Sequence, residues 1–212
     1  MTPLYRLDLL CKVGYGQRVA ADVDGARGRA GSGTDLRRDV VLTAALDTFT
    51  RYGYGKTSME DIARAGRISR PGLYFLFESK QALFAAAVGR ALDHDLRTAA
   101  RQLEDQARPL DERLLDAFDT WTGRYLGAVG GELSAVADAH RDLLGPRCAD
   151  APHRFHALVT DAIVSGRPPR DRAASKAIAR TLISTAIGLK HQTSSREAFR
   201  KGLRTAVALL LR

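Results

Sequence analysis

The chain has 212 residues, of which 45% are hydrophobic, and this supports a globular core in one or two domains. It carries 33 Lys and Arg against 24 Asp and Glu, but residues 34–90 hold only nine of these cations against six anions, so charge favours nucleic-acid binding weakly. Two cysteines without a spacing pattern, no apolar run near the roughly 18 residues of a membrane span, and no signal-peptide core predict a cytoplasmic protein without a disulfide framework.

Residues 1–33 are rich in glycine, lack sustained hydrophobic periodicity and end in GARGRAGSG. This composition predicts a flexible N-terminal extension. Two interpretations stay open. On the first, the stretch is a disordered extension or results from a start site placed too far upstream. On the second, it is a basic arm in which Arg27 and Arg29 touch phosphate or the minor groove.

An apolar stripe of Leu42, Leu46 and Phe49 predicts a helix over residues 35–52, which Gly53 ends. The following run, GYGKTSMEDIARAGRISRPGLYFLFESKQALF, predicts two short helices joined by a tight turn and the start of a third helix.

Three serines mark the helix starts in this run. Ser58 stands three residues before Asp61 and forms a capping box, Ser69 precedes a first turn that contains Pro71, and Ser79 precedes the third helix. Two short capped helices in a basic chain are typical of a protein that places one of them in a DNA groove.

Spacing also predicts which face of the second short helix is buried. Leu73 and Phe77 are four residues apart and share a face that packs on Ile62 and the preceding helix. The residues that then point outward are Arg70, Gly72, Tyr74 and Phe75.

These residues resemble the DNA-binding domain of the TetR family of bacterial transcriptional regulators over about residues 35–90. The family usually has Ala-Gly in the turn between the two helices, where this chain has Gly66 and Arg67. Either Arg67 takes the positive φ that the family's glycine favours, or Gly66 takes it with a one-residue shift. Leu76 is a second departure, because the family often has a polar residue there. The matching pieces are Phe49, Gly53-Tyr54, Thr57-Ser58-Met59, Asp61-Ile62-Ala63, Ile68-Ser69, Leu73-Tyr74, Phe77, Ser79-Lys80 and Leu83-Phe84.

The resemblance implies an all-α fold. We expect a helix-turn-helix DNA-binding domain over residues 34–84 and a helical-bundle domain for ligand binding and dimerisation over residues 85–212. The implied function is a sequence-specific transcriptional regulator, a ligand-responsive repressor that binds a palindromic operator as a homodimer. Its partners would be double-stranded DNA and a small-molecule effector, with no membrane.

The resemblance also implies roles for individual residues. Arg70 is the candidate for a base contact, Gly72 would let the backbone approach the groove, and Phe75 would pack on a thymine methyl group. Helix ends and the Tyr74 hydroxyl would contact phosphates. The expected DNA-binding residues are Thr57, Ser58, Ser69, Arg70, Pro71, Gly72, Tyr74, Phe75 and Lys80.

The remaining sequence is helical in pattern and shows no strand-like alternation. Glycines and prolines divide it into predicted helices at about 79–108, 111–129, 132–144, 152–165, 171–191 and 195–212.

An aromatic stripe lies on the second of these helices. Its residues are either bundle core or one wall of a ligand cavity, and the second interpretation rests partly on the family. The candidate pocket residues are Leu114, Phe118, Trp121, Tyr125, His140 and Phe155.

The last two helices have wide apolar faces. Core packing explains much of this pattern, and in the resembling family the corresponding helices form the dimer interface. The candidate interface residues are Ile178, Leu182, Thr185, Leu189, Phe199, Leu203 and Val207.

Catalytic and metal motifs do not emerge. Gly55-Lys56-Thr57 lacks the upstream glycine of a phosphate-binding loop, and His153 with His156 fits an ordinary surface pair better than a metal site. We therefore expect no enzyme, cofactor or metal. Two rival functions stay open: a nonspecific DNA-packaging protein, which would bind all duplexes equally, and a small helical enzyme, whose turnover would survive loss of the first 90 residues.

Overall fold

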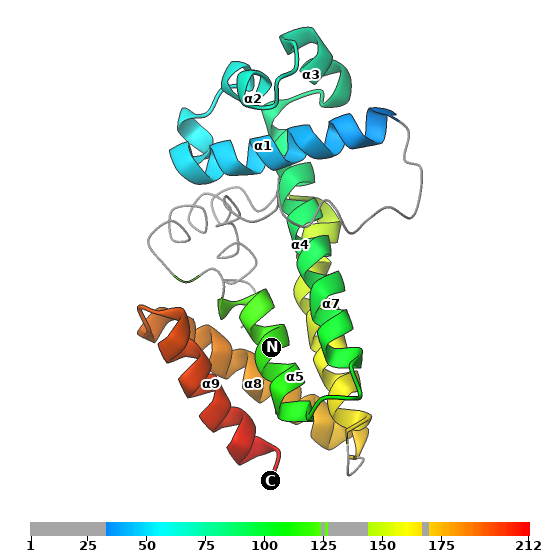
Figure 1. Cartoon of the computed structure of the whole chain (residues 1–212), viewed down its shortest axis with the longest axis vertical. Coiled ribbons are helices and arrows are strands. Elements are labelled where there is room, and N and C mark those ends of the chain that lie inside the picture. Colours follow the sequence, from blue (N-terminus) through cyan, green and yellow to red (C-terminus); the bar gives the residue numbers. More distant parts are fainter. Residues whose placement is uncertain (1–32, 124–125, 127–143, 167–169) are drawn as a thin grey trace. The chain divides into compact units, whose positions relative to one another are not determined.

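The computed structural model describes residues 33–123, 126, 144–166 and 170–212 (Figure 1). Throughout these ranges the regular structure is helical, which confirms the predicted all-α class. Contacts divide the described residues into an N-terminal body of residues 33–91 and 144–148 and a C-terminal body that holds the rest. None of the described helices is long and apolar enough to cross a membrane.

The N-terminal body begins with α1 (Gly33–Lys56), followed by α2 (Met59–Ala65) and α3 (Arg70–Leu76). Gly53 interrupts the helical backbone of α1 with φ 77° and ψ 157°, so the predicted helix end at this glycine is confirmed. The core is built from the expected stripe: Phe49 is fully buried and meets Phe84 edge-on, with ring centroids 5.1 Å apart.

Helix α4 (Lys80–Glu104) starts as predicted and ends earlier than predicted. The Ser79 Oγ accepts the N–H of Ala82 at 3.1 Å, which confirms the third cap. At the other end, Asp105 forms a turn: its side chain accepts the N–H of Ala107 at 3.2 Å and its carbonyl accepts the N–H of Arg108 at 3.1 Å. This turn ends the helix four residues before the predicted boundary, because an aspartate can replace the helical backbone bonds with its own.

The C-terminal body contains α5 (Leu110–Trp121), most of α7 (Gly145–Val164), α8 (Arg172–Gln192) and α9 (Arg196–Leu210). Helix α5 ends well before residue 129, and the helix predicted over 132–144 lies outside the described residues. Gly145 was predicted to stop a helix, but it begins α7 and has a φ of 70°. The helix can start here because the proline that follows Gly145 fits the first helical turn. Helices α8 and α9 start at capping residues Asp171 and Ser195, close to the predicted boundaries.

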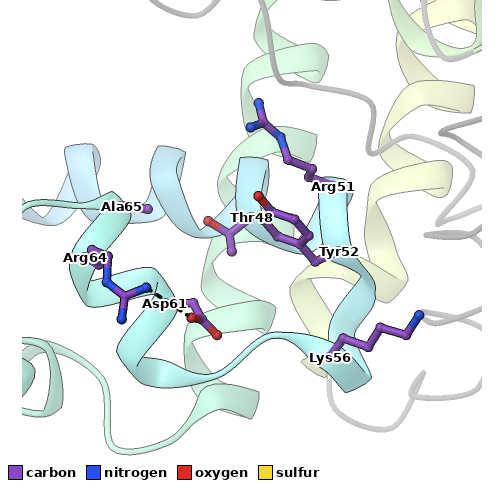
Figure 2. Close-up of a pocket in the computed structure, with 7 residues that line it drawn as sticks. All are labelled: Thr48, Arg51, Tyr52, Lys56, Asp61, Arg64 and Ala65. Atoms are coloured by element: carbon purple, nitrogen blue, oxygen red, sulfur yellow. Dashed lines mark ion pairs between the residues drawn. The ribbon is translucent and has the colours of Figure 1, made fainter.

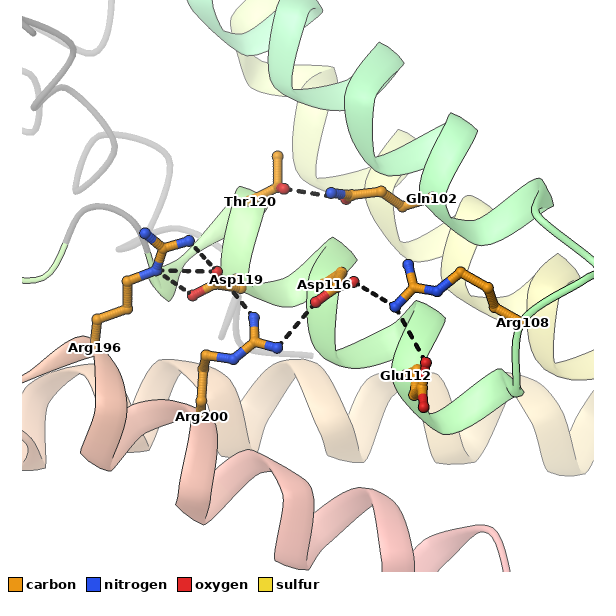
Figure 3. Close-up of polar contacts among 8 residues, drawn as sticks. All are labelled: Gln102, Arg108, Glu112, Asp116, Asp119, Thr120, Arg196 and Arg200. Atoms are coloured by element: carbon orange, nitrogen blue, oxygen red, sulfur yellow. Dashed lines mark hydrogen bonds and ion pairs between the residues drawn. The ribbon is translucent and has the colours of Figure 1, made fainter. Parts of the chain in front are cut away.

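Helix α9 packs against both α5 and α8. A chain of ion pairs joins α5 and α9 (Figure 3). The buried Asp119 carboxylate accepts hydrogen bonds from Arg196 and from Arg200. Asp116 accepts from Arg200 at 2.9 Å and from Arg108 at 2.8 Å. Burial alone would raise the pKa of Asp116, but the hydrogen bonds from the two arginines outweigh it and lower this pKa.

Gly123 makes the close approach of α5 and α9 possible. A Cβ at this position would lie 2.5 Å from Asp119 Oδ1 and 2.9 Å from the ring of Phe199. Any larger residue would push the two helices apart or displace the carboxylate from its arginines.

Candidate nucleic-acid interface

The helix pair α2 and α3 begins with the capping box predicted from the sequence. Ser58 Oγ accepts the N–H of Asp61 at 3.1 Å, and the Asp61 carboxylate accepts the N–H of Ser58 at 3.0 Å. The Ser58 hydroxyl also donates to the Asp61 carboxylate at 2.6 Å, and this bond, together with the one from the Ser58 N–H, lowers the pKa of Asp61. The capping box thereby satisfies two backbone N–H donors that would otherwise have no helical partner. This fixes where α2 starts.

Arg67 takes the unusual backbone conformation of the turn between α2 and α3. Its φ is 51°, whereas Gly66 has φ −80°. The turn is closed by hydrogen bonds from the N–H of Gly66 to the carbonyl of Ile62 at 2.8 Å and from the N–H of Ile68 to the carbonyl of Ala63 at 3.0 Å. Of the two sequence alternatives, the structure therefore has the one in which arginine replaces the glycine directly.

Helix α3 is anchored by its cap and by one apolar face. Ser69 Oγ accepts the N–H of Gly72 at 3.2 Å, and Leu73 and Phe77 are buried as predicted. A Cβ on Gly72 would lie 3.0 Å from Ser69 Oγ and 3.1 Å from a side-chain carbon of Ile68. Gly72 is half-buried, so the structure gives it a local role in packing the cap, where the sequence predicted only an approach to DNA.

The opposite face of α3 carries large side chains into solvent. Phe75 is 86% exposed, Tyr74 is 43% exposed, and Arg70 and Pro71 are also exposed. The Arg70 guanidinium carbon lies 5.8 Å from the centroid of the Tyr74 ring, a cation–π contact that aligns the two side chains on one side of the helix. An exposed phenylalanine beside an arginine and a tyrosine forms a surface suited to a partner rather than to water.

Two residues predicted to contact phosphate are engaged within the N-terminal body. Thr57 is 2% exposed, and its hydroxyl donates to the carbonyl of Gly53 at 2.8 Å. The Lys80 ammonium donates to the carbonyls of Tyr54 and Thr57, each at 3.0 Å, and lies 4.4 Å from the Tyr54 ring centroid. These side chains fasten the start of α4 to the segment between α1 and α2, and a phosphate contact by either residue stays a prediction.

Arg38 is a residue whose role the sequence analysis missed. Its guanidinium donates to the carbonyl of Leu76, the last residue of α3, at 3.1 Å, and its central carbon lies 4.3 Å from the Phe77 ring centroid. A cation at a helix C-terminus is stabilising. Arg38 and Leu76 are 38 residues apart, so no local spacing pattern could have indicated this contact.

A basic groove lies beside this helix pair, between α1 and α2 (Figure 2). Its volume is about 580 Å³, and its charged lining consists of Arg51, Lys56, Arg64 and Asp61. Asp61 is already bound by Ser58 and lies 3.8 Å from Arg64, so a positive excess remains. Such a surface attracts phosphate groups, and the sequence analysis did not identify it because its cations come from two helices.

The predicted ligand-pocket residues that fall within the described ranges form a packed aromatic cluster. Phe155 stacks on Trp121, with centroids 4.7 Å apart, and meets Phe118 edge-on at 5.2 Å. Leu114 is fully buried. Tyr125 and His140 lie outside the described residues. This geometry matches the bundle-core interpretation, and a ligand-binding role for these residues stays a prediction.

Most of the predicted dimer-interface residues are buried within the chain itself. Four of them are at most 1% exposed, because α5, α8 and α9 bury them against one another, and a contact of these four with a second copy stays a prediction. Leu189 packs beside Gly202, where a Cβ would lie 2.6 Å from it. Ile178 and Thr185 remain partly exposed. The four buried residues are Leu182, Phe199, Leu203 and Val207.

The fold and the capped helix pair define a helical protein of the helix-turn-helix class. Residues 41–87 match the family model described as bacterial regulatory proteins, tetR family. Over these residues the chain carries the DNA-binding domain of the TetR family, as the resemblance predicted.

Curated relatives match mainly through the same region. The chain is 38% identical over 74 residues to the HTH-type transcriptional regulator RutR of Escherichia coli K12, a match that covers 35% of this chain and 34% of RutR. It is 32% identical over 81 residues to the HTH-type transcriptional repressor ComR of the same strain, covering 38% and 39% of the two chains. The chain thus spans about a third of the length of RutR.

Solved structures match over more of the chain. A putative TetR-family regulator from Mesorhizobium loti MAFF303099 superposes with a TM-score of 0.70 at 17% identity, covering 85% of this chain and 98% of that one. A putative transcriptional regulator from Saccharomonospora viridis, solved in complex with choline, gives 0.63 at 20% identity, covering 81% and 95%. At these identities the likeness concerns the fold.

Proposed function

We propose that the protein is a sequence-specific DNA-binding transcriptional regulator, a ligand-responsive repressor that acts as a homodimer on a palindromic operator. The observation that carries this proposal is the outward face of α3, where Arg70, Tyr74 and Phe75 are exposed on a helix fixed by a serine cap and a buried opposite face. A rigid helix that presents such side chains is what reading of the major groove requires.

Each exposed residue has a role in this proposal. Arg70, on the first turn, donates two hydrogen bonds to a guanine edge, and Phe75 packs on a thymine methyl group. Tyr74 and Ser58 contact phosphates, which set the position of α3 in the groove. The cations of the groove between α1 and α2 add a contribution that depends on salt and not on sequence.

Two copies of the helix-turn-helix would read half-sites about one helical turn apart, roughly 34–36 Å. The partly exposed Ile178 and Thr185 on α8 and the 58% exposed Leu209 on α9 support a contact between copies through these helices. An effector bound in the C-terminal body would favour the dimer whose helices no longer fit that spacing. The repressor ComR and the choline complex of the Saccharomonospora viridis protein are precedents for repression and for ligand binding in proteins similar to this one.

The domain assignment belongs to the same proposal: residues 34–84 bind DNA, and residues 85–212 bind the effector and form the dimer. The extension over 1–33 lies outside the described residues. We place the protein in the cytoplasm and assign it no catalytic activity.

Selection of bound duplexes from a random pool tests this function directly. The proposal predicts an enriched inverted repeat whose half-sites are centred 10–10.5 base pairs apart or a multiple of that spacing. An unenriched pool would favour the nonspecific DNA-packaging alternative, and a single half-site without symmetry would contradict the homodimer.

A further inference from the structure

A second basic cavity lies in the C-terminal body, where the turn between α4 and α5 meets the end of α9. Its volume is about 590 Å³, within the range of about 300–1,000 Å³ typical of small-molecule sites. The lining combines arginines with apolar side chains that include Leu110, Val207 and Leu211. None of the residues in the aromatic cluster around Trp121 contributes to it, so it is a separate site.

Arg113, which lines this cavity, is a buried cation that has no carboxylate partner within the described ranges. It is 3% exposed, and its guanidinium donates to the carbonyl of Leu103, in the last turn of α4, at 2.6 Å. Its Nε is buried and has no hydrogen-bond partner among the described residues. The C-terminal end of α4 offsets part of the charge, but an ionic group buried without a counter-ion remains costly.

Arg170, a partly buried residue of the same lining, also donates to a carbonyl near a helix end. Its guanidinium donates to the carbonyl of Leu211, just after α9, and it has no carboxylate partner in the described parts of the chain. By contrast, Arg108 on the same lining is neutralised by Glu112 and Asp116 (Figure 3). The lining also holds an exposed carboxylate, Asp111, which pairs with neither Arg113 nor Arg170.

We infer that this cavity binds a small amphipathic carboxylate, with its anionic group at Arg113 and Arg170 and its apolar part against Leu110, Val207 and Leu211. A guanidinium matches the two oxygens of a carboxylate, and this pairing would supply the counter-ion that the buried Arg113 lacks. The apolar lining selects a ligand with a hydrocarbon portion over an inorganic oxyanion. The inference concerns the C-terminal body and does not depend on the proposed DNA binding.

Octanoate is a suitable probe, tested on the full chain by calorimetry and thermal unfolding at constant ionic strength. The inference predicts saturable binding and a thermal midpoint that rises with octanoate concentration. The matched probes are 1-octanol, which lacks the charge, and inorganic phosphate, which lacks the hydrocarbon. Both should bind at least about tenfold more weakly, a difference of about 1.4 kcal/mol.

Two variants locate the site without altering Arg113. Ala208 is exposed and lines the cavity, so Ala208→Trp should fill it, and Arg170→Gln removes one cation. Each should weaken octanoate binding at least about tenfold, whereas Arg101→Gln, an exposed cation outside the lining, should leave it unchanged. Absence of octanoate binding, equal binding of octanol or phosphate, or binding that persists in both lining variants would overturn the inference.

Discussion

Arg67 adopts a backbone conformation that residues with a Cβ rarely take, at the one turn whose geometry sets the angle between α2 and α3. With φ at 51°, it carries a conformational cost of roughly 1–2 kcal/mol that glycine would not pay. The local hydrogen bonds of Gly66 and Ile68 hold it there.

We therefore expect Arg67→Gly to stabilise the protein by about 1 kcal/mol, because it removes the strain of a positive φ. Arg64→Gly is the matched control: it makes the same change three residues earlier, inside α2, and should destabilise by about 1 kcal/mol. Urea unfolding of both variants measures whether each substitution raises or lowers the free energy of unfolding. Destabilisation by Arg67→Gly would mean that the arginine side chain contributes more than its backbone costs.

Arg70→Ala should reduce discrimination between operator and scrambled DNA by about 1–3 kcal/mol, because a bidentate contact to one base is lost. Binding to scrambled DNA should change much less. The control is Arg101→Ala, which removes the same charge from an exposed position on α4. Competition binding with both duplexes separates the effects of the two variants. Unchanged discrimination by Arg70→Ala would exclude Arg70 from base recognition.

At the level of the elements, helix starts were predictable where one side chain determines them. Ser58, Ser69 and Ser79 all cap the helices that their spacing predicted, since each cap involves residues within three positions. Which helix covers the apolar stripe on α9 was not predictable in this way. Phe199 and Leu203 would show the same spacing whether a helix of the same chain or of a second copy covered them, and only the fold reveals that α5 and α8 do so.

The ion-pair chain between α5 and α9 makes a prediction about their packing. Asp119→Ala should destabilise the protein by about 1–3 kcal/mol, because Arg196 and Arg200, which are themselves partly exposed, both lose the buried carboxylate that they contact. Glu112→Ala removes a carboxylate from the exposed end of the same chain and should cost at most about 1 kcal/mol. Equal effects in thermal unfolding would show that the buried position of Asp119 is unimportant.

Trp121 distinguishes a packed core from a ligand cavity. Because its indole stacks on the buried Phe155, Trp121→Ala should destabilise by about 3–5 kcal/mol, whereas Trp121→Phe should cost much less. Circular dichroism follows the unfolding, since Trp121 is the single tryptophan and its fluorescence is lost in both variants. A cost below about 1 kcal/mol for Trp121→Ala would indicate that the indole borders an open space, as the sequence-based pocket hypothesis requires.

At the scale of the whole molecule, we propose that the N-terminal body recognises DNA and that the C-terminal body binds the ligand and forms the dimer. The helix pair of the N-terminal body was predictable from the sequence, because the motif is short and its residues lie at fixed spacing. The cavity of the C-terminal body was not predictable, because Arg113 and Arg170 contact helix ends that only the fold brings near them.

The most direct test of the central claim is a competition titration of the full chain against its selected duplex and a scrambled duplex of equal length and composition. At physiological salt our proposal predicts at least about 10³-fold tighter binding to the selected duplex, since it assigns base contacts as well as phosphate contacts to the exposed face of α3. Equal affinity for the two duplexes would contradict sequence-specific recognition and leave only the electrostatic attraction of a basic helical protein for DNA.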